Sequence, residues 1–301
     1  RIIVVDQEGN GDSKTVQGAV DLVPENNEAR VKILVYPGVY REKVKIPENR
    51  PYISLIGDED DPSSVKITWS DKASDKSEHG GQIGTWNSAS VTVLSDYFCA
   101  KGVTFENTVV QGFDRGTGYQ AVAFRIGGDR AAFYRVRFLG YQDTLLDEKG
   151  SHYFLDCFIR GSTDFIFGNA KSLYKDCTIS FVGNEFAVAA HHRNSPTEDT
   201  GFSFVNSTIT GSGEVYLGRA WGNYSRIVYS HCRFNVRIRP GGWDDWSFPA
   251  RQKTAVFGEY ECSGIGADRS TRADWTKELS LTEATPFLTT TFIDGQQWLG
   301  L

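Results

Sequence analysis

The sequence contains no methionine and only five cysteines among its 301 residues. The cysteines lack the C-x-x-C spacing of a zinc site, and they are too sparse for a small domain stapled by disulfides. Because their number is odd, at least one thiol stays unpaired within a single chain. The sequence therefore leaves open the disulfide pairing of Cys99, Cys157, Cys177, Cys232 and Cys262.

Long apolar runs and an excess of basic residues are also absent. No stretch approaches the roughly 20 consecutive apolar residues of a membrane helix. The 32 Lys and Arg residues are outnumbered by 38 Asp and Glu residues, which gives a net charge of −6. We therefore expect neither a membrane-spanning protein nor a nucleic-acid-binding protein. The sequence has no G-x-S-x-G motif that would indicate a serine triad. It also lacks a dense carboxylate cluster for calcium, and we expect no metal and no cofactor.

Short runs rich in Val, Ile, Phe and Tyr, separated by Gly, Asp, Asn or Pro, dominate the chain and indicate strands. Before them, apolar residues between Val16 and Val23 recur at helical spacing ahead of Pro24, and Ser13 can cap this short helix. A second, weak helical signal lies in residues 271–285, where we expect a helix or tail that covers the open edge of the last strands. The strand-like runs are 31–36, 52–56, 65–69, 90–94, 102–105, 121–126, 132–138, 153–159, 173–181, 202–210, 215–217, 227–234 and 254–257.

Internal similarity predicts how these strands are arranged. Residues 153–159 (YFLDCFI) resemble residues 173–179 (LYKDCTI) at an offset of 20. Such short units cannot bury their apolar side alone, but stacked copies can, which predicts a parallel β-solenoid with one coil per repeat. In that arrangement Cys157 and Cys177 stack in the core as free thiols. Looser copies of the unit occur at 133–138, 204–209 and 229–234.

The same spacing brings chemically active side chains together. Gln120, Gln142 and Asp164 follow one another at intervals of 22, and Asp143 precedes Asp164 by 21. On neighbouring coils, whose strands lie roughly 4.8 Å apart, these four side chains share one patch of surface. Two carboxylates that close have separated pKa values, which suits a proton donor beside a nucleophile. The alternative is that these are ordinary turn residues.

Two further features extend this patch. Residues 216–220 echo residues 166–170 at an offset of 50, so Arg219 is expected beside Asp164, where its guanidinium would hold the carboxylate ionised. An ordinary surface salt bridge is the alternative. Tryptophans in Gly-, Asn- or Asp-rich loops suit a groove that stacks on sugar rings, although a loop tryptophan can equally anchor its own loop. These tryptophans are Trp86, Trp221, Trp243 and Trp246.

Five segments carry distinctive motifs, namely residues 38–42, 120–125, 141–145, 164–168 and 217–221. In this order they resemble the signature motifs of the pectin methylesterase family, and the likeness extends from about residue 3 to residue 299. The resemblance implies an all-β fold, a right-handed parallel β-helix with short N-terminal and C-terminal helical caps. It also implies a single catalytic β-helix domain over residues 1–301.

The resemblance implies a carboxylic ester hydrolase that removes methyl esters from galacturonate residues of pectin and releases methanol. It makes Asp164 the nucleophile and Asp143 the general acid and then the base. Gln120 and Gln142 become the amides that stabilise the oxyanion, and Arg219 holds Asp164. The residues implied to bind substrate are Thr85, Trp86, Phe167, Trp221 and Trp243.

The resemblance further implies a secreted monomer of the cell wall or apoplast that acts on methyl-esterified homogalacturonan. A proteinaceous pectin methylesterase inhibitor is an expected partner if the source is a plant. Sequons at Asn206 and Asn223 would matter in a secretory pathway, and their occupancy stays open. Two departures from the family pattern, Leu146 in place of Tyr and Ala220 in place of Pro, leave subsite preference open.

Two other functions remain alternatives. Paired carboxylates about 5 Å apart also fit a retaining glycosidase, such as a polygalacturonase-like β-helix. A non-catalytic solenoid that binds the cell wall is the third possibility, because a fold does not dictate an activity. The two glutamines favour the esterase, since acyl transfer needs an oxyanion hole and glycoside cleavage does not.

Overall fold

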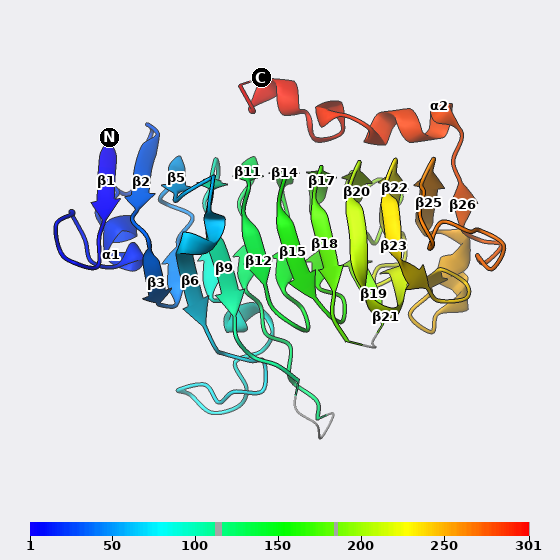
Figure 1. Ribbon diagram of the computed structural model, residues 1–301, viewed down its shortest axis with the longest axis horizontal. Coiled ribbons are helices and arrows are strands. Elements are labelled where there is room, and N and C mark those ends of the chain that lie inside the picture. The colour runs from blue at the N-terminus through cyan, green and yellow to red at the C-terminus, as the bar shows by residue number, and fades with distance from the viewer. Residues whose placement is uncertain (112–115, 184–185, 301) are drawn as a thin grey trace.

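Short parallel strands wound into an elongated solenoid make up most of the computed structural model (Figure 1), which describes residues 1–111, 116–183 and 186–300. The pairings between its named strands are parallel, as the repeats predicted. The strands form three faces, here called sheets A, B and C, and the long strand β21 (Thr208–Arg219) bends to take part in both B and C.

Each sheet takes one strand from each successive coil. Sheet A contains β1 (Ile2–Val5), β2 (Val31–Val35), β5 (Ile53–Ile56), β8 (Cys99–Lys101), β11 (Ala131–Tyr134), β14 (Ser151–Leu155), β17 (Lys171–Lys175), β20 (Gly201–Val205), β22 (Arg226–Ser230), β25 (Val256–Tyr260) and β26 (Lys277–Glu278). Sheet B contains β3 (Gly38–Arg41), β6 (Val65–Trp69), β9 (Thr104–Asn107), β12 (Arg137–Leu139), β15 (Phe158–Gly161), β18 (Thr178–Phe181), the first part of β21 and β23 (Arg233–Ile238). Sheet C contains β4 (Val44–Ile46), β7 (Val91–Val93), β10 (Phe124–Ile126), β13 (Leu145–Asp147), β16 (Ile166–Gly168), β19 (Ala187–His191), the last part of β21 and β24 (Trp243–Asp244).

A single residue in the left-handed conformation separates sheet A from sheet B in several consecutive coils. Several runs that the sequence predicts as one strand are therefore two strands on two faces; residues 153–159, for example, divide into β14 and β15. Asp and Asn tolerate the left-handed region better than β-branched residues do, which suits them to this corner. The corner residues are Arg135, Asp156, Asp176, Asn206, His231 and Glu261, with φ between 46° and 55°.

Aromatic rings stacked from coil to coil fill the core behind sheet A. Phe133 pairs in register with Phe154, and Phe154 with Tyr174. Their ring centres lie 4.6 and 4.4 Å apart, and the stack continues through Phe204 and Tyr229 at 4.7 and 4.6 Å. Such offset-stacked rings add to the stabilisation that comes from burying apolar area. In-register stacking of like residues thus confirms the architecture that the repeats predicted.

All five cysteines are free thiols. Cys157 and Cys177 are each 2% exposed and lie in the same core cluster, directly after the left-handed residues of their coils. The prediction that these two residues are stacked core thiols is therefore confirmed.

Helical segments occur at both ends of the chain, as predicted, but two details differ. The first helix, α1 (Val16–Asp21), is capped by Thr15, whose hydroxyl accepts from the Gly18 amide, and not by Ser13. The C-terminal segment runs back along the outer face of sheet A and does not close the last coil (Figure 1). It consists of α2 (Leu281–Ala284), η4 (Thr285–Phe287), η5 (Thr290–Ile293) and η6 (Gly295–Gln297); the other single turns are η1 (Pro62–Ser64), η2 (Trp86–Ser88) and η3 (Pro249–Lys253).

Apolar contacts explain where this tail lies. Phe292 and Ile293 of η5 are buried against residues of sheet A that point outward, among them Leu173. Along these strands, successive side chains alternate between the core and the outer face, so the residue beside each stacked ring faces outward. The tail covers this outward apolar stripe, which the sequence pattern did not distinguish from the core.

A fully buried polar cluster is centred on Asp147, the last residue of the strand β13. Asp147 accepts hydrogen bonds from the His152 ring and from the Tyr174 hydroxyl, the latter at 2.6 Å. The second ring nitrogen of His152 lies 2.7 Å from the carbonyl oxygen of Gly128. Because both ring nitrogens face acceptors, the doubly protonated imidazolium satisfies the site fully. Burial lowers the pKa of His152, but the neighbouring Asp147 carboxylate outweighs burial, and the net pKa is raised.

We expect this cluster to make the fold less stable as pH rises. The folded pKa of His152 lies above its unfolded value of about 6.5, so the stabilisation is complete below that pH and is lost as pH rises through the folded pKa. Urea unfolding between about pH 5.5 and about pH 9 should therefore show a steeper fall in unfolding free energy for the wild type than for His152→Gln. Parallel pH dependences for the two proteins would contradict the assignment.

Candidate active site

The two aspartates singled out by their spacing lie on neighbouring coils. Leu145 of β13 pairs with Ile166 of β16, so Asp143 and Asp164, each two residues earlier, occupy equivalent positions. The Asp143 amide donates to the Thr163 carbonyl at 3.1 Å, which extends this register to the aspartates themselves. The structure thus brings the two carboxylates together, as their offset of 21 residues predicted.

Both aspartates adopt the left-handed conformation at the corner that leads into sheet C. Their φ angles are 60° for Asp143 and 47° for Asp164. This conformation is unfavourable for residues with a Cβ atom, and strained backbone of this kind is concentrated at functional sites. The corner is packed closely, because a Cβ atom on Gly161 would lie 2.2 Å from that of Phe165. The close packing of this corner therefore limits the movement of the two acids.

Arg219, at the end of β21, holds one of the two acids. Its Nη1 donates to Oδ2 of Asp164 at 2.8 Å, and its Nε donates to Oδ1 of Asp244 at 3.2 Å. The guanidinium carbon lies 3.7 Å from the centre of a Trp246 ring, within the range of a cation–π contact. The second carboxylate oxygen of Asp164, Oδ1, is buried and has no hydrogen-bond partner among the described residues. One oxygen is thus fixed, and the other is left unengaged.

The electrostatics of the site separate the two acids. Burial raises the pKa of Asp164 to about 6, although the Arg219 guanidinium acts to lower it. Burial and the Asp164 charge raise the pKa of Asp143 well above its ordinary range, with only a smaller opposing effect from Arg219. Above about pH 6, the favoured state therefore has an ionised Asp164 beside a protonated Asp143.

A cleft of about 190 Å³ opens over the acids. Most of the predicted site residues line it, but Gln142 is not among the described residues that do. Gln142 lies on the coil next to Gln120, and its carbonyl oxygen accepts from the Ala121 amide at 3.2 Å. The lining residues are Thr85, Trp86, Gln120, Asp143, Asp164, Phe167, Ala190, Trp221 and Trp246.

Aromatic rings form one wall of the cleft. The ring centres of Trp86 and Trp221 are 6.2 Å apart, and each lies 6.1 Å from that of Phe167. Trp86 donates from its indole nitrogen to the Glu148 carboxylate at 3.1 Å. The ring centres of Trp221 and His192 lie 4.3 Å apart. These rings rest on a small apolar cluster that includes the buried Leu146. The wall is therefore held in place from behind.

Trp243 does not belong to this wall, so its predicted place in the substrate groove is wrong. It is 3% exposed and stacks on Phe257 in the core at 4.5 Å. Successive side chains of a strand point to opposite faces, and because Asp244 faces outward to Arg219, its neighbour Trp243 faces inward. Trp246, three residues later, lines the cleft instead. The sequence included Trp246 among the loop tryptophans, but nothing in the local pattern distinguished it from Trp243.

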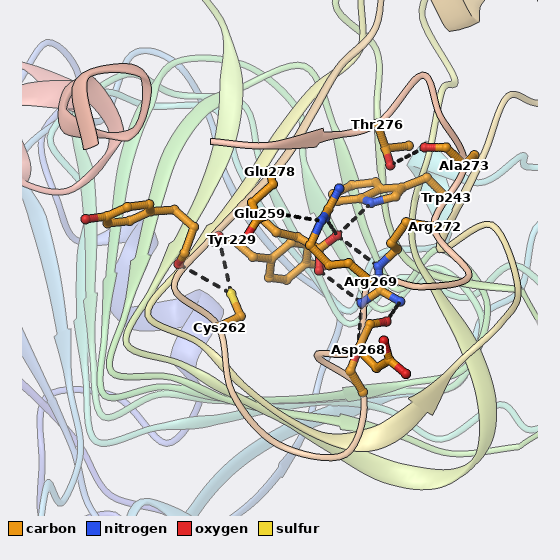
Figure 2. Close-up of polar contacts among 12 residues, drawn as sticks. Tyr229, Trp243, Glu259, Cys262, Asp268, Arg269, Arg272, Ala273, Thr276 and Glu278 are labelled. Carbon is orange, nitrogen blue, oxygen red and sulfur yellow. Dashed lines mark hydrogen bonds and ion pairs between the residues drawn. The ribbon is translucent and has the colours of Figure 1, made fainter. Parts of the chain in front are cut away.

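The buried carboxylate of Glu259 accepts a hydrogen bond from the Trp243 indole (Figure 2). Glu259, which is 3% exposed, accepts from the Trp243 indole nitrogen at 3.4 Å and from two nitrogens of Arg272 at 2.9 and 3.0 Å. Arg269 also donates to it at 2.5 Å. A buried charge needs such partners, and removal of one of them is costly. This cluster stabilises β24, the strand that supplies Asp244 to Arg219.

Comparisons with known proteins agree with the fold. A family model described as Pectinesterase matches residues 2–296. The chain is 58% identical to pectinesterase QRT1 of Arabidopsis thaliana over 302 residues, which covers 100% of this chain and 79% of that protein. Pectin methylesterase from carrot superimposes with a TM-score of 0.90 at 37% identity, over 99% of this chain and 94% of that one. The deglycosylated pectin methylesterase from Aspergillus niger superimposes with a TM-score of 0.83 at 28% identity, over 99% of this chain and 95% of that one.

The fold and these matches define a parallel β-helix enzyme of the carboxylic ester hydrolase class. The chain belongs to the pectinesterase family. Among the described residues, no helix is both long and apolar enough to cross a membrane.

The different placements of Trp243 and Trp246 predict different consequences of substitution. Trp243→Ala should lower the free energy of unfolding by roughly 3 kcal/mol or more, because it leaves a cavity in the core and removes one hydrogen-bond donor from the buried Glu259. Trp246→Ala should lower it by less than about 1 kcal/mol, since this ring lies at the cleft. Urea unfolding of both variants measures the difference, and equal losses would contradict the assignment of Trp243 to the core.

Proposed function

We propose that the enzyme removes methyl esters from galacturonate residues of pectin and releases methanol, with Asp164 as nucleophile and Asp143 as general acid and base. Membership of the pectinesterase family supports the substrate and the reaction class. The observation that carries the residue roles is the state of Asp164: one oxygen is bound by Arg219 and the other is buried and unengaged. An ionised carboxylate in that state is suited to attack a carbonyl carbon.

The first half of the reaction forms a covalent intermediate. Oδ1 of Asp164 attacks the carbonyl carbon of the methyl ester, and the carbonyl electrons move onto its oxygen. The amide of Gln120, and by the resemblance that of Gln142, donate hydrogen bonds to this oxyanion. Loss of one such donor typically raises the barrier by about 3 kcal/mol. As the carbonyl re-forms, the bond to methoxide breaks, and Asp143 protonates the leaving oxygen, so methanol departs.

The second half releases the acid product. Asp143, now a carboxylate, takes a proton from a water molecule, and the resulting hydroxide attacks the carbonyl carbon of the acyl-enzyme. The bond to Asp164 breaks, which restores the ionised Asp164 and frees the galacturonic acid product, whose proton is then lost to solvent. Asp143 is again protonated, as its raised pKa favours. The enzyme thereby returns to its starting state, with Asp143 protonated and Asp164 ionised.

The walls of the cleft would hold the polymer. Aromatic faces suit the apolar faces of sugar rings, and Trp86, Trp221 and Trp246 present such faces around the acids. Phe167 and Thr85 complete the same surface. We assign these five residues to binding of methyl-esterified homogalacturonan, with the residues that perform the chemistry beneath them.

Family membership also supports a proposal for where the enzyme works. We propose that it is secreted to the cell wall or apoplast, acts as a monomer within the single domain of residues 1–301, and uses neither metal nor cofactor. A proteinaceous inhibitor remains a predicted partner. Both sequon asparagines are exposed, Asn206 at a corner of the solenoid and Asn223 on the loop that carries Trp221.

Product analysis on methylated pectin tests the proposal. The wild type should release methanol and leave the chain length unchanged, and Asp164→Asn should reduce release to background. Asp143→Asn should bind pectin normally but turn over slowly. Asp156→Asn is a matched control, because Asp156 is also a left-handed corner residue but is exposed and pairs with Arg135. New reducing ends would instead indicate a glycosidase, and binding without either product would indicate a non-catalytic solenoid.

The pH dependence tests the two roles separately. Because Asp164 must be ionised, kcat/KM should fall as pH drops through about 6. Because Asp143 must be protonated, the rate should fall again at high pH, as its raised pKa is approached. Arg219→Gln should move the acidic limb to higher pH, since the guanidinium acts to lower the pKa of Asp164. An acidic limb near pH 4, or one that Arg219→Gln leaves in place, would contradict the assignment.

A further inference from the structure

The loop that presents Trp221 to the cleft depends on an arginine that lies outside the cleft. We propose that Arg251, in the single turn η3, is a positioning residue that sets the substrate affinity of the enzyme by holding this loop. The inference rests on the proposed function, because it assumes that Trp221 binds pectin. Arg251 does not belong to any of the motifs that the sequence analysis identified.

The Arg251 side chain donates hydrogen bonds to three acceptors of the loop. Nη1 of Arg251 donates to the carbonyl oxygens of Ala220 and Trp221, at 2.6 and 3.0 Å. Its Nε donates to the side-chain oxygen of Asn223 at 3.1 Å. Hydrogen bonds from a charged donor are stronger than neutral ones, and the planar guanidinium fixes the directions of all three. The backbone on both sides of the Trp221 side chain is therefore held by one group.

Two amides of the loop donate hydrogen bonds to carbonyl groups of the solenoid. The Ala220 amide donates to the Asp244 carbonyl at 2.8 Å, a bond that proline in this position could not make. The Gly222 amide donates to the His191 carbonyl at 3.0 Å. These bonds tie two amides of the loop to the solenoid, whereas Arg251 binds the carbonyl groups of Ala220 and Trp221. Ala220 lacks the rigidity of proline, and hydrogen bonds from its amide to Asp244 and from Arg251 to its carbonyl group hold the loop instead.

Arg251 is itself held firmly. Its guanidinium carbon lies 4.1 Å from the ring centre of Phe248, and its amide donates to the Phe248 carbonyl at 2.9 Å. The next residue, Gln252, donates to the Asp245 carboxylate at 2.8 Å, in the loop that carries Trp246. The η3 turn therefore connects the two loops that supply Trp221 and Trp246 to the cleft.

This arrangement predicts an effect on binding and not on chemistry. No hydrogen bond joins Arg251 to Asp143 or Asp164 in the part of the chain that the structure describes, and Arg251 does not line the cleft. Its loss would allow the Trp221 ring more orientations, so fewer molecules would present the bound geometry. The acids and their pKa values would stay as they are.

The test compares Arg251→Gln with wild type on methylated pectin. KM should rise roughly fivefold while kcat changes less than about twofold and the pH profile keeps its shape. Arg251→Lys, which keeps the charge but cannot reach three acceptors at once, should give an intermediate KM and provides the same test if the glutamine variant does not fold. Arg50→Gln is the matched control, because Arg50 also donates to a backbone carbonyl, that of Val20 at 2.8 Å, and it should leave KM unchanged.

A double substitution shows whether the effect passes through Trp221. In a Trp221→Ala background, Arg251→Gln should raise KM no further, since residues that act as a unit are not additive. An unchanged KM in Arg251→Gln, an equal fall in kcat, or additive effects in the double variant would each overturn the inference. Failure of the wild type to release methanol would instead overturn the proposed function, so the two outcomes are distinguishable.

Discussion

The ion pair between Arg219 and Asp164 is the interaction on which the site depends. Burial favours the neutral form of a carboxyl group, and it favours it for both acids of the cleft. The guanidinium, 2.8 Å from Asp164, offsets that effect for one acid more than for its neighbour. The result is one carboxylate and one carboxylic acid on adjacent coils. Asp244 holds the other side of the guanidinium, so the orientation of Arg219 is set by two carboxylates and not by one.

The solenoid supplies this arrangement because it repeats. Neighbouring coils bring equivalent residues within one strand spacing, so a pair of acids at an offset of 21 residues lies together without any long-range loop. The stacked rings and the corner residues in the left-handed conformation hold the coils in register. The buried cluster around Glu259 has a related role at the far end, where it fixes the strand that carries Asp244 (Figure 2).

The sequence predicts the repeating part of the molecule well. The offsets between like segments predict the parallel coils and the free core thiols, and they bring Asp143, Asp164 and Arg219 together. The sequence could not predict the direction in which particular side chains point. Whether Trp243 or Trp246 faces the cleft depends on which way a two-residue strand alternates. The left-handed corners divide single apolar runs into two strands, and no periodicity within a run reveals them.

Contacts between distant segments were likewise beyond local patterns. The C-terminal tail covers an outward stripe whose apolar residues read as core in the sequence. Arg251 lies 30 residues from Trp221, and the link between them becomes visible only when the carbonyl groups of the loop are located. The helix cap differs by two residues, from Ser13 to Thr15, because the two hydroxyls are equivalent in sequence terms.

The most direct test of the central claim is a titration of the two carboxyl groups. Carbon-13 NMR of protein labelled at the aspartate carboxyl carbons, with signals assigned by Asp143→Asn and Asp164→Asn, reports each protonation state against pH. The account predicts that Asp164 titrates near pH 6 and Asp143 at a clearly higher pH. Two ordinary titrations near pH 4 would show that the site does not separate the acids, and the division of roles between them would be contradicted.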